Sequence, residues 1–258
     1  MTRGPRLDPG FLTRPLAHRT LHDVRAGRPE NSLSGARAAV LAGYGIEVDI
    51  QRSADRVAMV FHDDVLDRLT ARGGPVAALS AADLSKTRLT HGTEGIPTLG
   101  ALLEVVSGRV PLLIEVKDQT GSLGDADAGL ENAVAQALAG YPGPVAVMSF
   151  NPHSVARLAK LLPGVARGLV TDPFARDDWP EFSEARLKAL RAMPDLDRVG
   201  ATFVSHNWRD LGAPAVAQAR DSGRDVLTWT VRSHDEEAVA RKVAQNVTFE
   251  RYLSPVPA

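Results

Sequence analysis

Two pairs of charged residues, each with a spacing of two, interrupt apolar stretches of the chain. The pairs are Glu47 with Asp49 and Glu115 with Lys117. Residues i and i+2 of a β-strand project from the same face, so each pair presents its two groups together. Three converging carboxylates form the oxygen-rich cage that suits Mg²⁺ or Ca²⁺. The alternative is a set of buried ion pairs in which Lys117 neutralises Glu115.

Two histidines and an arginine add groups suited to proton transfer and phosphate binding. His18 and Arg19 end one apolar run, and His62 precedes Asp63 at the end of another. Histidine titrates near neutral pH, and a guanidinium binds phosphate oxygens with paired donors. For His62 and Asp63 the alternative is an ordinary surface turn. In combination with the carboxylates, the set favours a site for phosphate chemistry.

The elements that must position these residues follow an alternating pattern. Short apolar runs alternate with helical patterns, which is typical of βαβ units around a parallel sheet. Eight runs are predicted as strands: Pro15–His18, Ile46–Ile50, Val110–Val116, Val145–Phe150, Ala166–Thr171, Ala201–Ser205, Val226–Val231 and Asn246–Tyr252. Eight parallel strands favour a closed (β/α)8 TIM barrel, an α/β fold whose catalytic groups lie at the carboxyl ends of the strands.

Several helices have recognisable starts. Leu99, Leu102, Leu103 and Val106 follow helical spacing after Thr98, a predicted N-cap. Asn151 before Pro152 opens another helix, and Ser233 with Glu236 forms a predicted capping box.

One long excursion separates the second and third predicted strands. Residues 51–97 begin with a predicted hairpin in which Val57, Met59 and Phe61 alternate with other residues. We interpret this excursion as an active-site insertion within one domain that spans residues 1–258. Little sequence follows the eighth run, so the final barrel helix is expected to be missing or truncated.

Composition narrows the class of protein. Charged residues make up 24% of the 258 residues, and the formal net charge of −1 argues against a nucleic-acid partner. The absence of cysteine excludes disulfides, thiolate catalysis and sulfur ligands for a metal. No apolar stretch approaches the roughly 20 residues of a membrane span, and no secretion signal is evident. We expect a cytoplasmic protein with a small-molecule substrate and no integral membrane association. The oligomeric state stays open.

The order of the motifs resembles the glycerophosphodiester phosphodiesterase family, whose members are phospholipase C-like barrels. That family carries His-Arg-Gly, Pro-Glu-Asn, Glu-x-Asp, His-Asp and Glu-x-Lys in sequence. The chain reads His18-Arg19-Thr20, Pro29-Glu30-Asn31, Glu47-Val48-Asp49, His62-Asp63 and Glu115-Val116-Lys117. The chain differs from the family pattern at two places. Thr20 stands where the family has glycine, and Thr248–Tyr252 stands where the family has an Asp-Gly strand followed by Thr-Asp-x-Pro.

The resemblance implies roles for these residues. Glu47, Asp49 and Glu115 would bind a divalent cation, Mg²⁺ or Ca²⁺. Arg19 and Lys117 would bind the phosphate. His18 and His62 would serve as the catalytic acid and base.

Two further residues are candidates for substrate binding. His206 follows the sixth predicted strand, where it is either a pocket residue or a loop histidine. Trp229 lies within a strand and would form an apolar wall of the pocket, although core packing is the commoner role.

The resemblance implies a metal-dependent hydrolase that cleaves glycerophosphodiesters to an alcohol and glycerol phosphate. One alternative is a lysophospholipid-cleaving enzyme of the same fold, which would need a larger apolar entrance. A second is a non-catalytic phosphate-binding barrel. A third is a lyase or isomerase with Lys117 as its base, which the phosphate-directed set with Arg19 disfavours.

Overall fold

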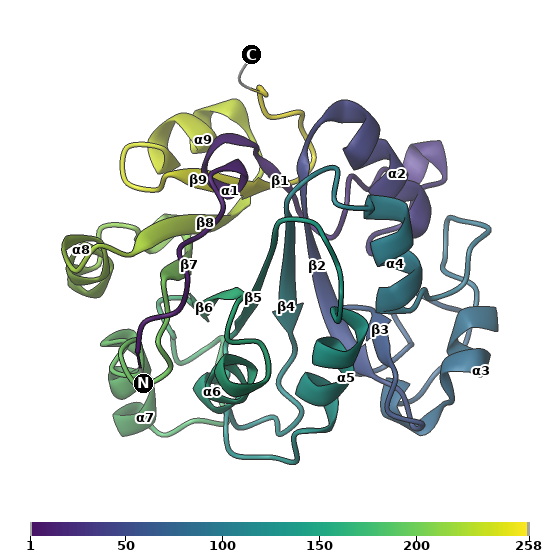
Figure 1. Cartoon of the computed structure of the whole chain (residues 1–258), viewed down its shortest axis with the longest axis horizontal. Helices are drawn as coiled ribbons and strands as arrows, with labels where there is room; N and C mark the ends of the chain where they lie inside the picture. The colour runs from purple at the N-terminus through teal and green to yellow at the C-terminus, as the bar shows by residue number, and fades with distance from the viewer. Residues whose placement is uncertain (1, 257–258) are drawn as a thin grey trace.

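Eight parallel strands close into a barrel in the computed structural model, which describes residues 2–256 (Figure 1). The strands are β1 (Leu16–Ala17), β2 (Gly45–Arg52), β4 (Leu112–Val116), β5 (Val145–Ser149), β6 (Ala166–Thr171), β7 (Phe203–Asn207), β8 (Asp225–Val231) and β9 (Asn246–Phe249). Each pairs with the next, and β1 pairs with both β2 and β9, which closes the ring. The predicted (β/α)8 barrel is confirmed.

Helices surround the barrel and connect its strands (Figure 1). They are α2 (Leu33–Ala42), α4 (Leu99–Val106), α5 (Gly129–Ala137), α6 (Pro152–Leu161), α7 (Glu184–Arg191), α8 (Pro214–Asp221) and α9 (His234–Ala240). The predicted N-caps are confirmed, because Thr98, Asn151 and Ser233 accept hydrogen bonds from backbone N–H groups of their helices. Among residues 250–256, no helix follows β9.

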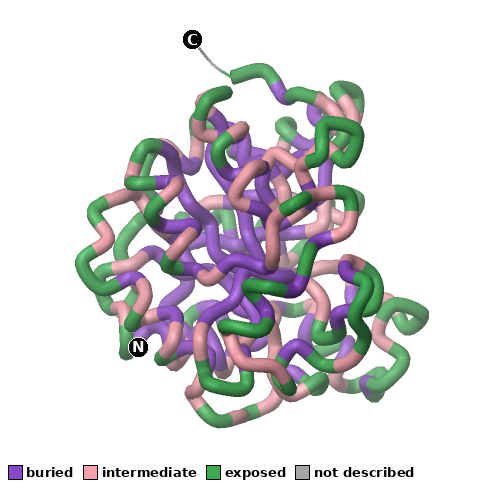
Figure 2. The backbone as a smooth tube through the Cα atoms, turned by 90° about the vertical axis from the view of Figure 1, so that its right-hand side faces the viewer, coloured by how far each residue is buried: buried purple, intermediate pink, exposed green. Residues whose placement is uncertain are grey.

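Side chains along each barrel strand alternate between two environments. In β2, Ile46, Val48 and Ile50 pack against the outer helices, while Glu47 and Asp49 point into the barrel. This is the period-2 geometry of a strand with both faces covered. The tube view shows the resulting concentration of buried residues in the centre of the molecule (Figure 2).

Apolar side chains fill the barrel interior below the charged residues. The interior cluster consists of Leu7, Phe11, Leu16, Leu113, Ala146, Met148, Ala166, Val170, Phe203 and Leu227. A Cβ at Gly168 would lie 2.4 Å from the ring of Phe203, so glycine leaves the space that this ring fills. The helix α1 (Gly10–Thr13) caps the amino end of β9, where the Asn246 side chain donates to the Phe11 carbonyl at 2.8 Å.

The excursion at residues 51–97 carries its own small apolar cluster. The strand β3 (Ala58–Val60) pairs antiparallel with β2, which confirms the predicted hairpin. The 3₁₀ turn η2 (Val76–Ala78) and the helix α3 (Ala81–Lys86) follow. The cluster consists of Met59, Phe61, Leu66, Val76, Leu84, Leu89 and Ile96. This packing fixes the chain that carries His62.

Some predicted bounds are wrong. The strand predicted at 201–205 is β7 (Phe203–Asn207), because its pairing with β6 begins where Phe203 lies opposite Gly168. The last strand ends at Phe249 and not at Tyr252. The first barrel strand is only two residues long.

None of the helices in the described part of the chain has both the length and the apolarity needed to cross a membrane.

Candidate active site

A pocket of about 170 Å³ opens at the carboxyl ends of the barrel strands. It is lined by His18, Arg19, Glu47, Asp49, His62, Glu115, Lys117, Met148, Phe150, Trp229, Thr230, Arg232 and Thr248. All the residues predicted for the site lie here except His206. The period-2 pairs bring charged groups from β2 and β4 together because Asp49 lies opposite Glu115 in the strand pairing.

Three buried carboxylates form the floor of the acidic part of the pocket. One ligand oxygen from each of Glu47, Asp49 and Glu115 lies within 4.8 Å of the others, and the residues are 2%, 2% and 8% exposed. Burial, together with the charges of Asp49 and Glu115, raises the pKa of Glu47 well above its usual value. Three carboxylates this close together repel one another when they are ionised. A hard divalent cation, which takes oxygen ligands, would neutralise that repulsion.

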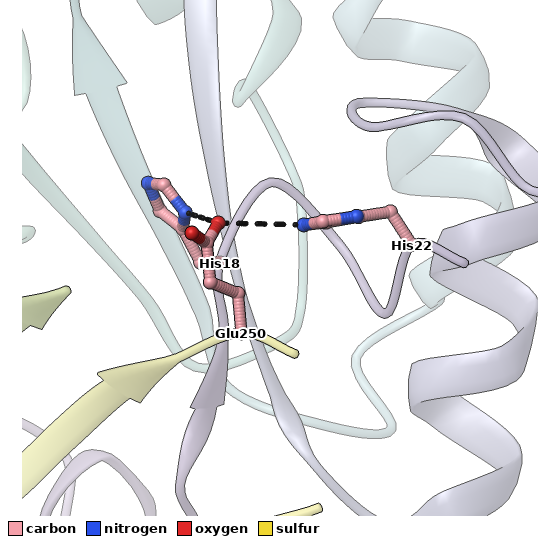
Figure 3. A group of neighbouring side chains, drawn as sticks. All are labelled: His18, His22 and Glu250. Atoms are coloured by element: carbon pink, nitrogen blue, oxygen red, sulfur yellow. Dashed lines mark hydrogen bonds and ion pairs between the residues drawn. The ribbon is translucent and has the colours of Figure 1, made fainter. Parts of the chain in front are cut away.

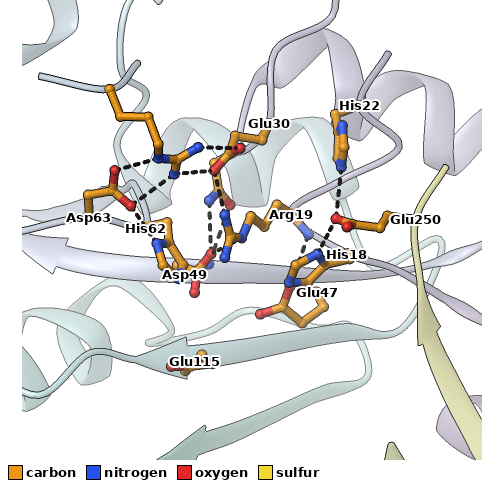
Figure 4. A network of polar contacts seen from close by, with 12 residues as sticks. His18, Arg19, His22, Glu30, Glu47, Asp49, His62, Asp63, Glu115 and Glu250 are labelled. Carbon is orange, nitrogen blue, oxygen red and sulfur yellow. Dashed lines mark hydrogen bonds and ion pairs between the residues drawn. The ribbon is translucent and has the colours of Figure 1, made fainter. Parts of the chain in front are cut away.

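Two cationic side chains border these carboxylates, and Figure 4 shows one of them, Arg19, beside Asp49. Lys117 Nζ lies 2.8 Å from Glu115 Oε1 and 3.4 Å from Asp49 Oδ1, and Arg19 Nε lies 3.5 Å from Asp49 Oδ2. Burial opposes ionisation of Asp49, but the charges of Lys117 and Arg19 outweigh it and hold the Asp49 pKa well below its usual value.

Glu47 lies apart from these ion pairs. It accepts the backbone N–H of Arg19 at 2.9 Å, and no ion pair to it is present among residues 2–256. Ion pairing alone therefore leaves one of the three buried carboxylates without a cation.

Each pocket histidine is bound to a carboxylate through Nδ1. His18 Nδ1 lies 2.7 Å from Glu250 Oε2, and His62 Nδ1 lies 2.6 Å from Asp63 Oδ1. Burial lowers the pKa of His18, although the hydrogen bond to Glu250 opposes this change. In both residues the carboxylate contact leaves Nε2 as the ring nitrogen for exchange with a ligand.

Polar contacts behind the pocket residues join the insertion to the barrel (Figure 4). Arg68 donates to both oxygens of Glu30 and both oxygens of Asp63 at 2.7–2.9 Å. Glu30 in turn accepts from Arg19 at 2.8 Å. Arg68 was missed by sequence reasoning, since its position in the insertion has no periodic signal.

Glu250 was also missed as a site residue. Thr248, which lines the pocket, lies two positions before it. The period-2 rule therefore offered a signal that Glu250 faces the same side of the barrel.

The opposite side of the pocket is apolar. Trp229 and Phe150 meet edge to face with ring centroids 5.7 Å apart, and Met148 lies beside them. The indole N–H of Trp229 donates to the carbonyl of Ser205 at 2.9 Å, which fixes the ring. Trp229 therefore lines the pocket on its apolar side.

His206 does not line the pocket, contrary to the prediction. Because β7 continues to Asn207 and Phe203 points inward, His206 points outward from the barrel. Its Nδ1 lies 2.8 Å from Thr171 Oγ1, its Nε2 lies 3.2 Å from Asp210, and it is 1% exposed. A strand end placed two residues too early caused the error.

Comparisons with known sequences point to one family. The model of the glycerophosphoryl diester phosphodiesterase family matches residues 18–248. YhdW of Bacillus subtilis (strain 168) is 28% identical over 221 residues, which cover 81% of this chain and 84% of that protein. Glycerophosphodiester phosphodiesterase 1 of Mus musculus is 26% identical, with 90% of this chain and 75% of that protein covered.

The fold also matches solved structures. A phosphodiesterase of Oleispira antarctica, solved in complex with the product sn-glycerol-3-phosphate, superposes with a TM-score of 0.72 at 23% identity. The superposition covers 95% of this chain and 93% of that one, and at this identity it supports the fold alone. The chain therefore belongs to the glycerophosphoryl diester phosphodiesterase family and is a phosphoric diester hydrolase.

Proposed function

We propose that the protein is a metal-dependent hydrolase of glycerophosphodiesters that releases an alcohol and glycerol phosphate. The observation that carries the proposal is one pocket with three buried carboxylates, two cationic side chains that border them, and two histidines anchored through Nδ1. The match to the glycerophosphoryl diester phosphodiesterase family over residues 18–248 supports glycerol phosphate as a product.

Glu47, Asp49 and Glu115 are the proposed ligands of Mg²⁺ or Ca²⁺. Bound there, the cation supplies positive charge against the negative charge of the phosphoryl oxygens. Arg19 and Lys117 bind the non-bridging oxygens, which reduces their repulsion of an incoming nucleophile. Trp229 and Phe150 provide an apolar surface for carbon atoms of the substrate.

His18 and His62 are the proposed proton-transfer residues. The incoming oxygen forms a bond to phosphorus and belongs to water or to a neighbouring hydroxyl of the substrate. In the second case a cyclic glycerol phosphate forms first, and water then opens it to glycerol phosphate. The bond from phosphorus to the oxygen of the alcohol breaks. One imidazole takes the proton of the incoming oxygen at Nε2, and the other gives a proton from Nε2 to the leaving alkoxide.

Hydrolysis of glycerophosphocholine and of a bis-aryl phosphate, with and without a chelator, tests the proposal. We expect activity that is lost on chelation and restored by a divalent cation. Glu47→Gln, His18→Ala and His62→Ala should each reduce kcat by about 100-fold or more. Unchanged turnover in Glu47→Gln would exclude the proposed metal site. An inactive wild type on every diester would favour the non-catalytic barrel.

Glu131→Gln is a matched control for the loss of a buried carboxylate. Glu131 is 5% exposed and lies on α5, outside the pocket. We expect this variant to retain wild-type kcat and metal dependence. If kcat falls as much in Glu131→Gln as in Glu47→Gln, the effect of Glu47→Gln is due to a change in folding and not to loss of a metal ligand.

A further inference from the structure

Glu250 lies directly after β9, between two imidazoles that come from a different part of the chain (Figure 3). Its Oε2 lies 2.7 Å from His18 Nδ1 and 3.5 Å from His22 Nε2. The two rings approach the carboxylate from opposite sides (Figure 3). His22 lies in the sequence between the His18-Arg19 and Pro29-Glu30-Asn31 motifs. It contacts Glu250, which is the hydrogen-bond partner of the pocket residue His18.

Two arginines bind the other oxygen of the same carboxylate. Arg232 Nε lies 2.7 Å from Glu250 Oε1, and Arg251 Nε lies 3.6 Å from it. Arg232 is itself held, because its backbone N–H donates to Glu236 Oε2 at 2.6 Å. The Glu250 side chain is 9% exposed, so contacts on both oxygens fix its orientation.

The charge state of Glu250 follows from these contacts. Burial opposes ionisation, but hydrogen bonds from His18 and His22 and the charge of Arg232 outweigh it and keep the Glu250 pKa well below its usual value. An ionised carboxylate can only accept hydrogen bonds. The proton between His18 and Glu250 therefore belongs to Nδ1 of the imidazole.

We propose that Glu250 is a positioning residue that holds the His18 proton on Nδ1 and so presents Nε2 to the pocket. The proposal rests on the proposed function of His18 in proton transfer. His22 acts one step further away, since it contacts the carboxylate that fixes the imidazole. Arg232, which also lines the pocket, holds the other oxygen of the same carboxylate. Loss of such a partner typically costs about 10–100-fold at sites where a carboxylate orients a metal-ligating histidine, and we expect a loss of that order for His18.

The same three residues also have the composition of a second metal site. Ligand atoms of His18, His22 and Glu250 lie within 4.8 Å of one another. Two guanidinium groups at Oε1, however, place positive charge where a cation would bind. A metal would also replace the 2.7 Å hydrogen bond of His18. The contacts therefore favour the positioning role.

Two substitutions of Glu250 separate the loss of the acceptors from the loss of the fold. Glu250→Met removes both acceptor oxygens at similar length, and Glu250→Gln keeps one oxygen. With glycerophosphocholine we expect kcat to fall about 10–100-fold in Glu250→Met and less in Glu250→Gln, with KM changed by less than about threefold. The graded loss in kcat is the signature of an oriented catalytic group.

Glu237→Gln is the matched control. Glu237 is a buried glutamate of α9 that accepts from Tyr252 at 2.9 Å and from Ser254 at 2.8 Å. It holds the same segment after β9 without contacting His18. We expect wild-type kcat in this variant. An equal loss in Glu237→Gln would make the effect of Glu250 structural and would overturn the proposal.

A second readout does not depend on activity. Nitrogen-15 NMR of the imidazole rings should show neutral His18 protonated at Nδ1 in the wild type and a mixture of tautomers in Glu250→Gln. If the wild type hydrolyses no diester, the proposed function fails, while this spectrum still tests the positioning. A wild-type spectrum in which neutral His18 is protonated at Nε2 would contradict the positioning role of Glu250.

Metal titration tests the alternative hypothesis that His18, His22 and Glu250 bind a second metal ion. We expect Mn²⁺ binding to the wild type to disappear in Glu47→Gln and to persist in His22→Ala. A bound equivalent of Mn²⁺ that persists in Glu47→Gln and disappears in His22→Ala would make Glu250 a ligand and overturn the positioning role.

Discussion

The hydroxyl oxygen of Thr20 occupies the space that a side chain at Gly35 would need, since a Cβ built on Gly35 lies 2.2 Å from it. Thr20 has a φ of 72°, in the left-handed region that β-branched residues avoid. The family has glycine at this position, and the turn after Arg19 does require a glycine-like backbone. The threonine adopts that backbone, and Gly35 of α2 provides the room for its side chain.

This pair should show strong energetic coupling. Gly35→Ala in the wild type forces a clash between two buried groups, and we expect it to lower the free energy of unfolding by about 1–3 kcal/mol. In the Thr20→Gly background the oxygen is absent, so the same substitution should cost much less. Urea unfolding of the four proteins measures the coupling. Equal costs in both backgrounds would show that the clash is not the cause.

Arg68 should be important for catalysis although it lies outside the pocket lining. Its guanidinium fixes Asp63, which binds His62, and Glu30, which binds Arg19. We expect Arg68→Ala to lower kcat/KM for glycerophosphocholine by about 10–100-fold. The reason is that the carboxylates that orient His62 for proton transfer and Arg19 for phosphate binding would no longer be held in place.

The control for this substitution is Arg72→Ala. Arg72 is an exposed arginine of the same insertion, four residues away. We expect its kcat/KM to stay within about twofold of the wild type, because surface substitutions usually have small effects. Comparable losses in both variants would point to a general effect of charge on the insertion.

The barrel and the charged pairs could be predicted from sequence because both depend on local periodicity. An apolar run such as Ala166–Thr171 gave the bounds of β6 without error. The spacing of Glu47 and Asp49 places both on one face of a strand before any tertiary contact is known. Such patterns need only neighbours in the chain.

The contacts that orient the histidines could not be predicted in the same way. His18 and Glu250 are 232 positions apart, and no local pattern links them. Arg68 reaches Glu30 across 38 positions, from an insertion whose path depends on its own apolar cluster. The outward direction of His206 depended on the end of one strand, which sequence patterns fix poorly.

Glu47→Gln should stabilise the metal-free protein. The raised pKa of Glu47 means that its protonated form contributes stability below pH 4.5, and this contribution is lost as pH rises through the raised value. Glutamine mimics the protonated form, so at pH 7 we expect a gain on the order of 1 kcal/mol.

Addition of a divalent cation should reverse that order. Binding to the native state at 100 times Kd adds about 2.7 kcal/mol to wild-type stability, and Glu47→Gln should gain far less. Thermal unfolding with EDTA, Mg²⁺ or Ca²⁺ measures both effects. A variant that is less stable than the wild type under EDTA contradicts the proposed repulsion among the carboxylates.

Glu250 should have the opposite pH dependence. Because its pKa is depressed, its ionised form contributes stability above the usual value of 4.5, and the contribution is lost as pH falls from there toward the native-state pKa. We expect the wild type to be more stable than Glu250→Gln at pH 7 and the difference to shrink below pH 4.5. Urea unfolding between pH 7 and pH 3.5 measures this difference, and a constant gap over that range would argue against an ionised Glu250.

The size of the pocket predicts a preference among substrates. A volume of about 170 Å³ is below the range of about 300–1,000 Å³ that is typical of sites for drug-sized ligands. A glycerophosphodiester with a small alcohol therefore fits better than a lysophospholipid, whose acyl chain would extend beyond a pocket of this size. We expect kcat/KM for glycerophosphocholine to exceed that for lysophosphatidylcholine by about tenfold or more.

Trp229→Ala tests whether the apolar wall sets this preference. Removal of the indole enlarges the apolar side, so the ratio of the two kcat/KM values should shift toward lysophosphatidylcholine. Trp208→Ala is the control, because Trp208 lies in the 3₁₀ turn η3 (Trp208–Asp210) and does not line the pocket. If the wild type instead has the higher kcat/KM for lysophosphatidylcholine, the protein is a lysophospholipid-cleaving enzyme. The acyl chain would then gain binding energy from contacts outside the small pocket.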